Sequence, residues 1–391
     1  MSEELAEDLP IGSPAAARVL RTLLGEPGQV MTRERLGQVT RLSSAAITRA
    51  VRPLIGAGYL AEQAAAPRGR GRPVKQLQLV ADRACFVGVK VEATDAVACL
   101  VDLAGQSLAE ARVGLASTEV GEVLDAVVDA ARAVVEEAAP RVPLGTAISL
   151  SGDVDAITGR VHFSPFLGWR GVDVADLLTE RLGCVPVVEN DVRALTLLEQ
   201  IAGVGRRGDS FVLVTLGTGI GAGISVNGQV VEGTFGVAGE IGHLRVEPTG
   251  PQCYCGSQGC VETVAADPAI LAAVRRSHPE VESIADVLAL AGTEDVATLA
   301  ALERAGEAVG TAIAAVTNLI GPRWLVLADE SLAQHRVGST ALDAAYRRAA
   351  YGDAVRCEVV PRDMRTEDWA RGAAVVALTS WVERVSGRSL D

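Results

Sequence analysis

Apolar residues recur every three or four positions in three short segments of the first eighty residues, a period that predicts three short helices. The first starts at Ser13-Pro14, where a hydroxyl that can cap the helix precedes a proline at the first helical position. Thr32 and Ser43 are placed to cap the second and third helices. The alternating residues 76–80 then predict the returning strand of a β-hairpin. This pattern is typical of a winged helix-turn-helix domain, which we assign to residues 13–80.

From residue 82 onward, continuous apolar runs alternate with longer helical stretches, which indicates an α/β fold. The runs predict strands that are buried on both faces: 85–91, 96–102, 146–150, 185–191, 211–216 and 324–328. Helical periods cover 122–137 and a final segment, 369–385. No apolar stretch approaches the roughly 20 residues needed to span a bilayer, so we expect no membrane partner. The acidic first residues lack a secretory signal, which favours a cytoplasmic protein.

Charge is distributed unevenly along this acidic chain, whose formal net charge is −13. Residues 9–80 carry eleven Lys or Arg but only three acidic residues, Glu26, Glu34 and Glu62. A basic segment on an acidic protein suggests that this segment alone meets a polyanion.

The polar positions of the third predicted helix and the loop between the hairpin strands are the expected contacts to double-stranded DNA. Arginines separated by glycine suit a narrow minor groove, whose negative potential attracts guanidinium groups. A charged helix face is often merely solvated, but the caps, the basic face and the arginine-rich loop together favour DNA binding. The residues are Ser44, Thr48, Arg49 and Arg52 on the helix, and Arg68, Arg70 and Arg72 in the loop.

Four residues near the middle of the chain have the spacing of a metal site. His243 is followed after nine residues by Cys253, Cys255 and Cys260. Three thiolates and one imidazole form the closed, tetrahedral ligand set of a structural zinc ion. A coincidental cluster or a disulfide is the alternative. The other four cysteines lie in apolar surroundings and are expected to be buried thiols, which fits a reducing compartment.

The same segment, Gly-Glu-Ile-Gly-His followed by Cys-Tyr-Cys-Gly-Ser-Gln-Gly-Cys-Val-Glu, resembles the signature of the ROK family of repressors, open reading frames and sugar kinases. The resemblance extends over nearly the whole chain. It implies an actin/hexokinase-like ATPase-type fold of two α/β lobes behind the winged helix-turn-helix. The small lobe would comprise 82–191, completed by the C-terminal helix 369–391, and the large lobe 192–368 would hold the zinc loop.

The resemblance also implies a sugar pocket in the cleft between the lobes. Its residues would be Asn190, Asp191, Glu240, His243 and Glu262, which match family positions that contact sugar hydroxyls. The alternatives are that Asn190 or Asp191 caps a helix, and that the two glutamates are solvated acids.

In the kinases of this family, a turn between the first two strands carries an Asp-x-Gly-Gly-Thr motif that holds ATP phosphates and magnesium. The matching residues 90–94 are Lys-Val-Glu-Ala-Thr, although the second glycine-rich loop, 217–223, is intact. Phosphate needs close approach to backbone N–H groups, which glycine permits, and Glu92 would repel it. We therefore expect no catalytic residues and no kinase activity.

The leading hypothesis is a sugar-responsive transcriptional regulator that binds operator DNA as a homodimer or dimer of dimers and contains zinc. The alternative is an ATP-dependent sugar kinase with a DNA-binding extension. A third reading is a regulator whose effector is a phosphosugar or a partner protein.

Overall fold

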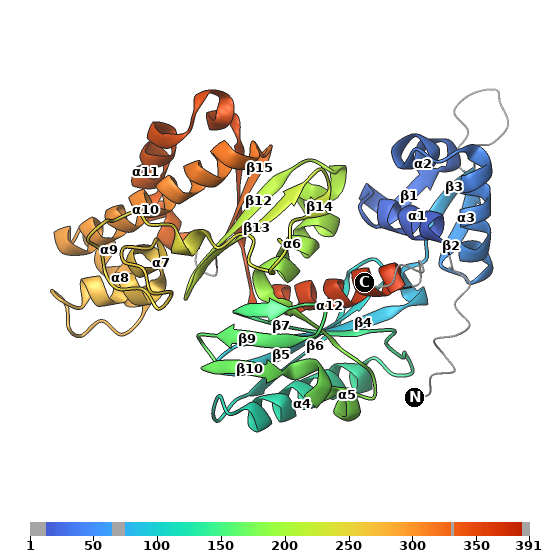
Figure 1. Ribbon diagram of the computed structural model, residues 1–391, viewed down its shortest axis with the longest axis horizontal. Coiled ribbons are helices and arrows are strands. Elements are labelled where there is room, and N and C mark those ends of the chain that lie inside the picture. The colour runs from blue at the N-terminus through green and yellow to red at the C-terminus, as the bar shows by residue number, and fades with distance from the viewer. Residues whose placement is uncertain (1–12, 65–74, 330–331, 385–391) are drawn as a thin grey trace. The chain divides into compact units, whose positions relative to one another are not determined.

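The computed structural model describes residues 13–64, 75–329 and 332–384, which form two compact units (Figure 1). The first unit is Met1–Gly208 together with Thr366–Asp391, and the second unit is Asp209–Arg365. The C-terminal segment is therefore part of the same unit as the N-terminal domain. None of the helices in the described ranges is long and apolar enough to cross a membrane.

The first unit begins with the three predicted helices, which we call the head together with their small sheet (residues 13–80). Side chains of Ser13, Thr32 and Ser43 accept hydrogen bonds from backbone N–H groups in the first turns, as the sequence predicted. Arg41, in the left-handed region at φ 55°, makes the tight turn before the third helix. The helices are α1 (Pro14–Leu24), α2 (Arg33–Thr40) and α3 (Ser44–Gly56), and the sheet has the order β1 (Val30–Thr32), β3 (Lys75–Leu79), β2 (Leu60–Ala64).

The rest of the first unit is built on a five-stranded sheet. Three of its strands form an antiparallel meander, and two further strands run parallel to the first of them. In sheet order these are β11 (Val187–Asn190), β7 (Thr146–Leu150), β4 (Cys85–Val91), β5 (Asp95–Asp102) and β6 (Ser107–Gly114). Three helices, α4 (Val120–Glu137), α5 (Val174–Leu182) and α6 (Asp191–Ala202), and a small sheet, β8 (Asp153–Asp155), β9 (Arg160–Ser164) and β10 (Trp169–Asp173), complete it.

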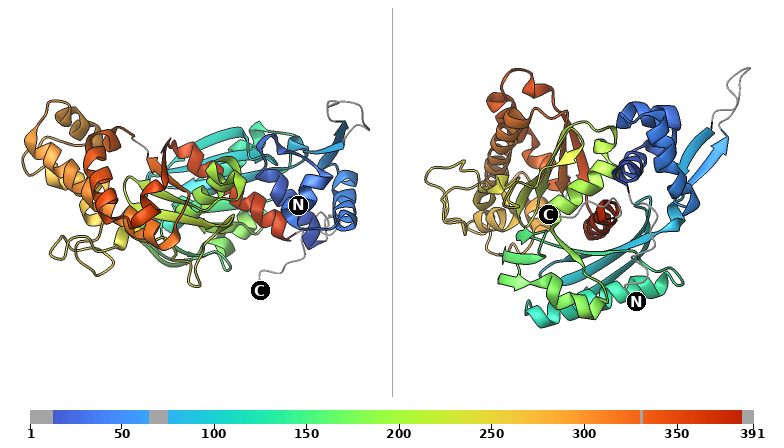
Figure 2. Two further views of the ribbon diagram at one scale, coloured as in Figure 1. Left: turned by 90° about the horizontal axis from the view of Figure 1, so that it is seen from above. Right: turned by 45° about the vertical axis from the view of Figure 1, so that its right-hand side comes forward.

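The last helix, α12 (Thr366–Arg384), packs against β4, β5 and α6 (Figure 2). Gly88 permits this packing, because a Cβ atom there would lie 2.0 Å from the backbone nitrogen of Ala374 and 2.3 Å from the carbonyl oxygen of Ala370. The strand and the helix are thus in direct backbone contact at this point.

The second unit is built on another five-stranded sheet, in which β12, β15 and β16 are parallel. Its order is β14 (Gln229–Val230), β13 (Ile220–Val226), β12 (Phe211–Leu216), β15 (Trp324–Asp329) and β16 (Glu358–Asp363). Its helices are α7 (Glu262–Ala265), α8 (Asp267–Val274), α9 (Ile284–Ala291), α10 (Val296–Ile320) and α11 (Leu332–Ala349). They bury an apolar core that includes Ile313 and Val287.

Candidate metal centre and effector-site residues

The four predicted metal ligands lie together in the second unit, and their ligand atoms are all within 4.8 Å of one another. The Cys253 sulfur is 3.5 Å from Nδ1 of His243, and the sulfurs of Cys255 and Cys260 are 3.7 Å apart. Tetrahedral zinc bonds of about 2.3 Å to sulfur and about 2.0–2.1 Å to nitrogen place such pairs about 3.6 Å and about 3.8 Å apart. The cluster therefore has the donor set and the spacing of a tetrahedral metal site.

The loop that carries the cysteines depends on a glycine. Gly259 has a φ of 66°, and a Cβ atom there would lie 1.6 Å from the carbonyl oxygen of Glu247. Glu247 in turn receives a 2.6 Å hydrogen bond from Nε of Arg304 on α10, which ties the loop to the helical layer. The arginine also lowers the pKa of the Glu247 carboxyl, which favours the charged form that pairs with Arg304.

The opposite side of the His243 ring faces polar side chains that sequence analysis partly missed. The hydroxyl of Tyr254 lies 3.2 Å from Nε2 of His243, and the Glu240 carboxylate lies 3.8 Å from the same nitrogen. Burial, followed by the charges of Glu262 and Glu240, raises the pKa of Tyr254. Tyr254 therefore lies close to three predicted effector residues, His243, Glu240 and Glu262. Sequence analysis did not select Tyr254, although its position between Cys253 and Cys255 was a signal that could have found it.

The other two predicted effector residues lie in the first unit, where β11 meets α6. Asn190 is the N-cap of α6: its Oδ1 accepts hydrogen bonds from the backbone of Val192 and Arg193, and its Nδ2 donates to the carbonyl oxygen of Gly152. Its contacts are those of the capping interpretation.

Asp191 is buried, and its carboxylate makes an ion pair with Lys90 at the end of β4. The two side chains are only 8% and 7% exposed. The ammonium also lies 5.2 Å from the centre of the Trp369 ring on α12, a cation–π distance. Lys90, Asp191 and Trp369 therefore join three elements that are far apart in the sequence.

The turn that replaces the phosphate motif is closed by its own hydrogen bonds. The backbone N–H of Glu92 donates to the carbonyl oxygen of Asp95 at 2.8 Å. Burial raises the pKa of Glu92, and the charges of Lys90 and Arg112 partly offset this. A carboxyl group is therefore part-buried beside the turn.

The four predicted DNA-contacting residues of α3 are all exposed: Ser44, Thr48, Arg49 and Arg52. The buried side of the helix is formed by Ile47, Ala50, Val51 and Leu54. The arginines predicted in the hairpin loop, Arg68, Arg70 and Arg72, lie outside the described residues.

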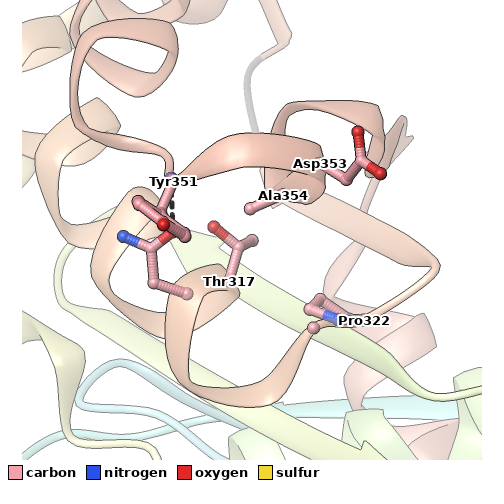
Figure 3. A pocket seen from close by; sticks show the side chains of 7 residues that line it. Thr317, Pro322, Tyr351, Asp353 and Ala354 are labelled. Atoms are coloured by element: carbon pink, nitrogen blue, oxygen red, sulfur yellow. Dashed lines mark hydrogen bonds between the residues drawn. The ribbon is translucent and has the colours of Figure 1, made fainter.

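A separate crevice of about 310 Å³ lies in the second unit, lined by the end of α10 and the residues after α11 (Figure 3). The amide side chain of Asn318, which lines the crevice, already makes two hydrogen bonds within the protein. It accepts from the N–H of Tyr351 at 2.8 Å and donates to the carbonyl oxygen of Ala349 at 3.0 Å. The crevice contains none of the predicted site residues.

Two α/β units, one carrying a His/Cys₃ cluster, define the class of an actin/hexokinase-like protein. The ROK family model matches residues 86–380. The transcriptional dual regulator NagC of Escherichia coli is 30% identical over 315 residues, 77% of each chain. The chain belongs to the ROK family.

Two solved structures are similar to this one. A ROK family transcriptional regulator, described as a homologue of E. coli Mlc, matches with a TM-score of 0.79 and 25% identity over 95% of this chain and 96% of its own. A ROK glucokinase of Streptomyces griseus, in complex with glucose and AMPPNP, matches with a TM-score of 0.66 and 26% identity over 75% of this chain and 99% of its own.

Proposed function

We propose that this protein is a sugar-responsive, DNA-binding transcriptional regulator of the ROK family that acts in the cytoplasm. The observation that carries the proposal is the likeness to a ROK transcriptional regulator over 95% of the chain, whereas the glucokinase matches only 75%. The family model begins at residue 86, so the head lies outside the part shared by the whole family. An added head on the shared fold is what a regulator needs and a kinase does not.

The head is proposed as a winged helix-turn-helix in which α3 enters the major groove. Ser44, Thr48, Arg49 and Arg52 are its exposed polar residues. Helices of this kind present their first turns to base edges, and arginine is suited to both guanine and phosphate. Arg68, Arg70 and Arg72 of the hairpin loop complete the proposed interface.

A homodimer, or a dimer of dimers, would pair two heads on one operator. Half-sites would then be spaced by about 34 Å or a multiple of it, one turn of DNA.

The effector is proposed to be a sugar or a sugar derivative. Asn190 and Asp191 of the first unit and Glu240, His243 and Glu262 of the second would contact its hydroxyl groups. The contact between the Tyr254 hydroxyl and Nε2 of His243 supports this, because a sugar hydroxyl would make the same kind of contact with the imidazole. Carboxylates and imidazole are suitable partners for a polyol. Another relative, 30% identical over 315 residues, is named the N-acetylglucosamine repressor of Escherichia coli O6:H1, which makes N-acetylglucosamine the first ligand to test.

Zinc is the proposed metal, held by His243, Cys253, Cys255 and Cys260. With four protein ligands the ion has no open position, so it would stabilise the loop rather than activate water. The metal would supply only this cross-link. His243 would connect this cross-link to the proposed effector residues, since its Nε2 lies 3.2 Å from the Tyr254 hydroxyl.

Loss of kinase activity is proposed because the residues of the first phosphate loop are engaged elsewhere. Lys90 is paired with Asp191, which by the resemblance to the sugar kinases of the family matches their general base. Magnesium needs oxygen ligands, and an ammonium group supplies none. The turn hydrogen bond of Glu92 removes a backbone donor that phosphate would need.

A thermal-shift screen of sugars and sugar phosphates, beginning with N-acetylglucosamine, glucose and xylose, tests the effector class. The full-length protein is then used to select bound sequences from random duplex DNA, with and without a sugar that shifts the melting temperature. We expect Glu240→Gln to lose the sugar response and to retain DNA binding, because Glu240 is a proposed effector residue with an exposed side chain. Failure to select any DNA sequence, or phosphorylation of a sugar in a coupled assay with Mg-ATP, would refute the proposed regulator.

A further inference from the structure

Lys90 occupies a junction of three structural elements in the first unit. It lies at the end of β4, its partner Asp191 is the first residue of α6, and Trp369 lies in the first turn of α12. The ion pair is almost completely removed from solvent. Separating two buried opposite charges is costly, so the pair holds the three elements in one arrangement.

The elements that meet there are packed too tightly to move independently. Gly88, two residues before Lys90, brings β4 into backbone contact with α12. On the other side of α12, a Cβ atom at Gly372 would lie 3.0 Å from the carbonyl oxygen of Ala194 on α6. A displacement of β4 or α6 at the ion pair is therefore passed to α12 as a movement of the whole helix.

The other end of α12 contacts the head. The Trp381 ring lies 5.3 Å from that of Tyr59 and 5.5 Å from that of Phe86, between centroids. Arg21 of α1 makes a 3.1 Å ion pair with Glu383. Trp369 and Trp381 are twelve residues apart, about 18 Å along a helix. The first turn of α12 thus contacts Lys90, which is the partner of the proposed effector residue Asp191. The other end of the same helix contacts the head.

We propose that Lys90, Asp191 and Trp369 form an ionic latch through which occupancy of the effector site is transmitted along α12 to the head. The proposal rests on the proposed function for the identity of the two ends. A sugar hydroxyl that donates to Asp191 takes up one hydrogen-bonding position of this carboxylate, and a sugar oxygen that accepts from Lys90 keeps the shifted ammonium group partnered. Movement of the ammonium group away from the Trp369 ring releases the first turn of α12. The effector then shifts the population between two positions of the helix, and of the head that it contacts.

Hydrogen exchange measured by mass spectrometry on the full-length protein tests the latch without sugar or DNA. The variants are Lys90→Met and the neutral pair Lys90→Met/Asp191→Asn. Arg112→Met is the matched control, because Arg112 on β6 also pairs with the first turn of α12, at Glu367, but is exposed. We expect both latch variants to exchange at least tenfold faster in α12 and in α1, and the control to match the wild type.

A purely local role gives a different pattern. In that case Lys90→Met affects only amides next to the uncompensated Asp191, the neutral pair restores them, and α1 stays within twofold of the wild type in both. That result would overturn the proposal. Trp369→Leu keeps the ion pair and does not depend on burying an altered charge. It should also accelerate exchange in α1, and wild-type exchange there would likewise refute the latch.

The chain contains only two lysines, Lys75 and Lys90, which allows a direct observation of the latch. In protein labelled with ¹⁵N-lysine, the Lys90 ammonium should give a signal that is protected from solvent, whereas Lys75, 67% exposed, serves as the internal reference. An ammonium signal of Lys90 as exchangeable as that of Lys75 would contradict the ion pair. Because these measurements need neither ligand, their failure would leave the proposed function standing.

Discussion

Removal of one proposed zinc ligand gives the sharpest test of the candidate metal centre, and Cys255→Ser is the variant of choice. Cys253 and Cys260 are buried, so their loss would also disturb packing, whereas Cys255 is exposed and serine leaves no cavity in its place. A ligand that binds only the folded protein, present at a thousand times its dissociation constant, stabilises that protein by about 4 kcal/mol. The second unit spans residues 209–365, and in domains of about 150–250 residues each kcal/mol moves the melting temperature by about 2–4 °C. We therefore expect Cys255→Ser, or complete removal of the metal by a chelator, to lower the melting temperature of the second unit by roughly 8–16 °C.

Differential scanning calorimetry, together with elemental analysis of the same samples, measures this effect. Cys357→Ser is the matched control, since Cys357 lies in the same unit but outside the cluster. The control should retain one zinc per chain. Unchanged melting after zinc has been removed, or full zinc content in Cys255→Ser, would refute the assignment.

Three further outcomes are expected. Arg49→Ala should weaken DNA binding as measured by fluorescence anisotropy. Loss of a phosphate contact should also reduce the slope of log affinity against log salt concentration by about 1. Unchanged binding would exclude Arg49 from the interface. Trp381→Ala should destabilise the first unit by about 3–5 kcal/mol, a usual cost for truncating a buried aromatic side chain, and urea unfolding that matches the wild type would show that α12 does not support the head. Isothermal titration with Mg-ATP should give no saturable heat, and sugar turnover at about 1–100 per second would contradict the proposed role of Lys90.

Local sequence signals predicted most of the fold. The hydroxyl caps at Ser13, Thr32 and Ser43 act within three residues of chain, and the buried strands are nearly continuous apolar runs, so both are legible without tertiary information. The edge strand β16 was not predicted, because its exposed, polar sequence interrupted by Pro361 lacks the apolar run of its neighbour β15. The short strands β8 to β10 were missed for the same reason.

The cluster of His243 with Cys253, Cys255 and Cys260 was predicted because the four residues lie within eighteen residues of one another, so their spacing can be read from the sequence. Their role as zinc ligands stays a prediction. The pairing of Lys90 with Asp191 spans 101 positions, and only the register of β4 beside β7 and β11 brings them together. Sequence alone marked Lys90 as an unsuitable residue for phosphate binding. It gave no indication that the ammonium group neutralises the carboxylate of another proposed site.

The packing of Trp381 on Tyr59 also has a consequence for synthesis of the protein. The ribosome releases the head first, but the residues of α12 that belong to its apolar cluster are made more than three hundred residues later. At about 5–20 residues per second, the delay is roughly 15–60 seconds. Until α12 has been synthesised, Tyr59 and its apolar neighbours in the head lack the α12 side chains that bury them in the complete protein. A chain that terminates early therefore carries an exposed apolar patch at its amino end, and transiently exposed apolar surface of this kind makes a chain prone to aggregate.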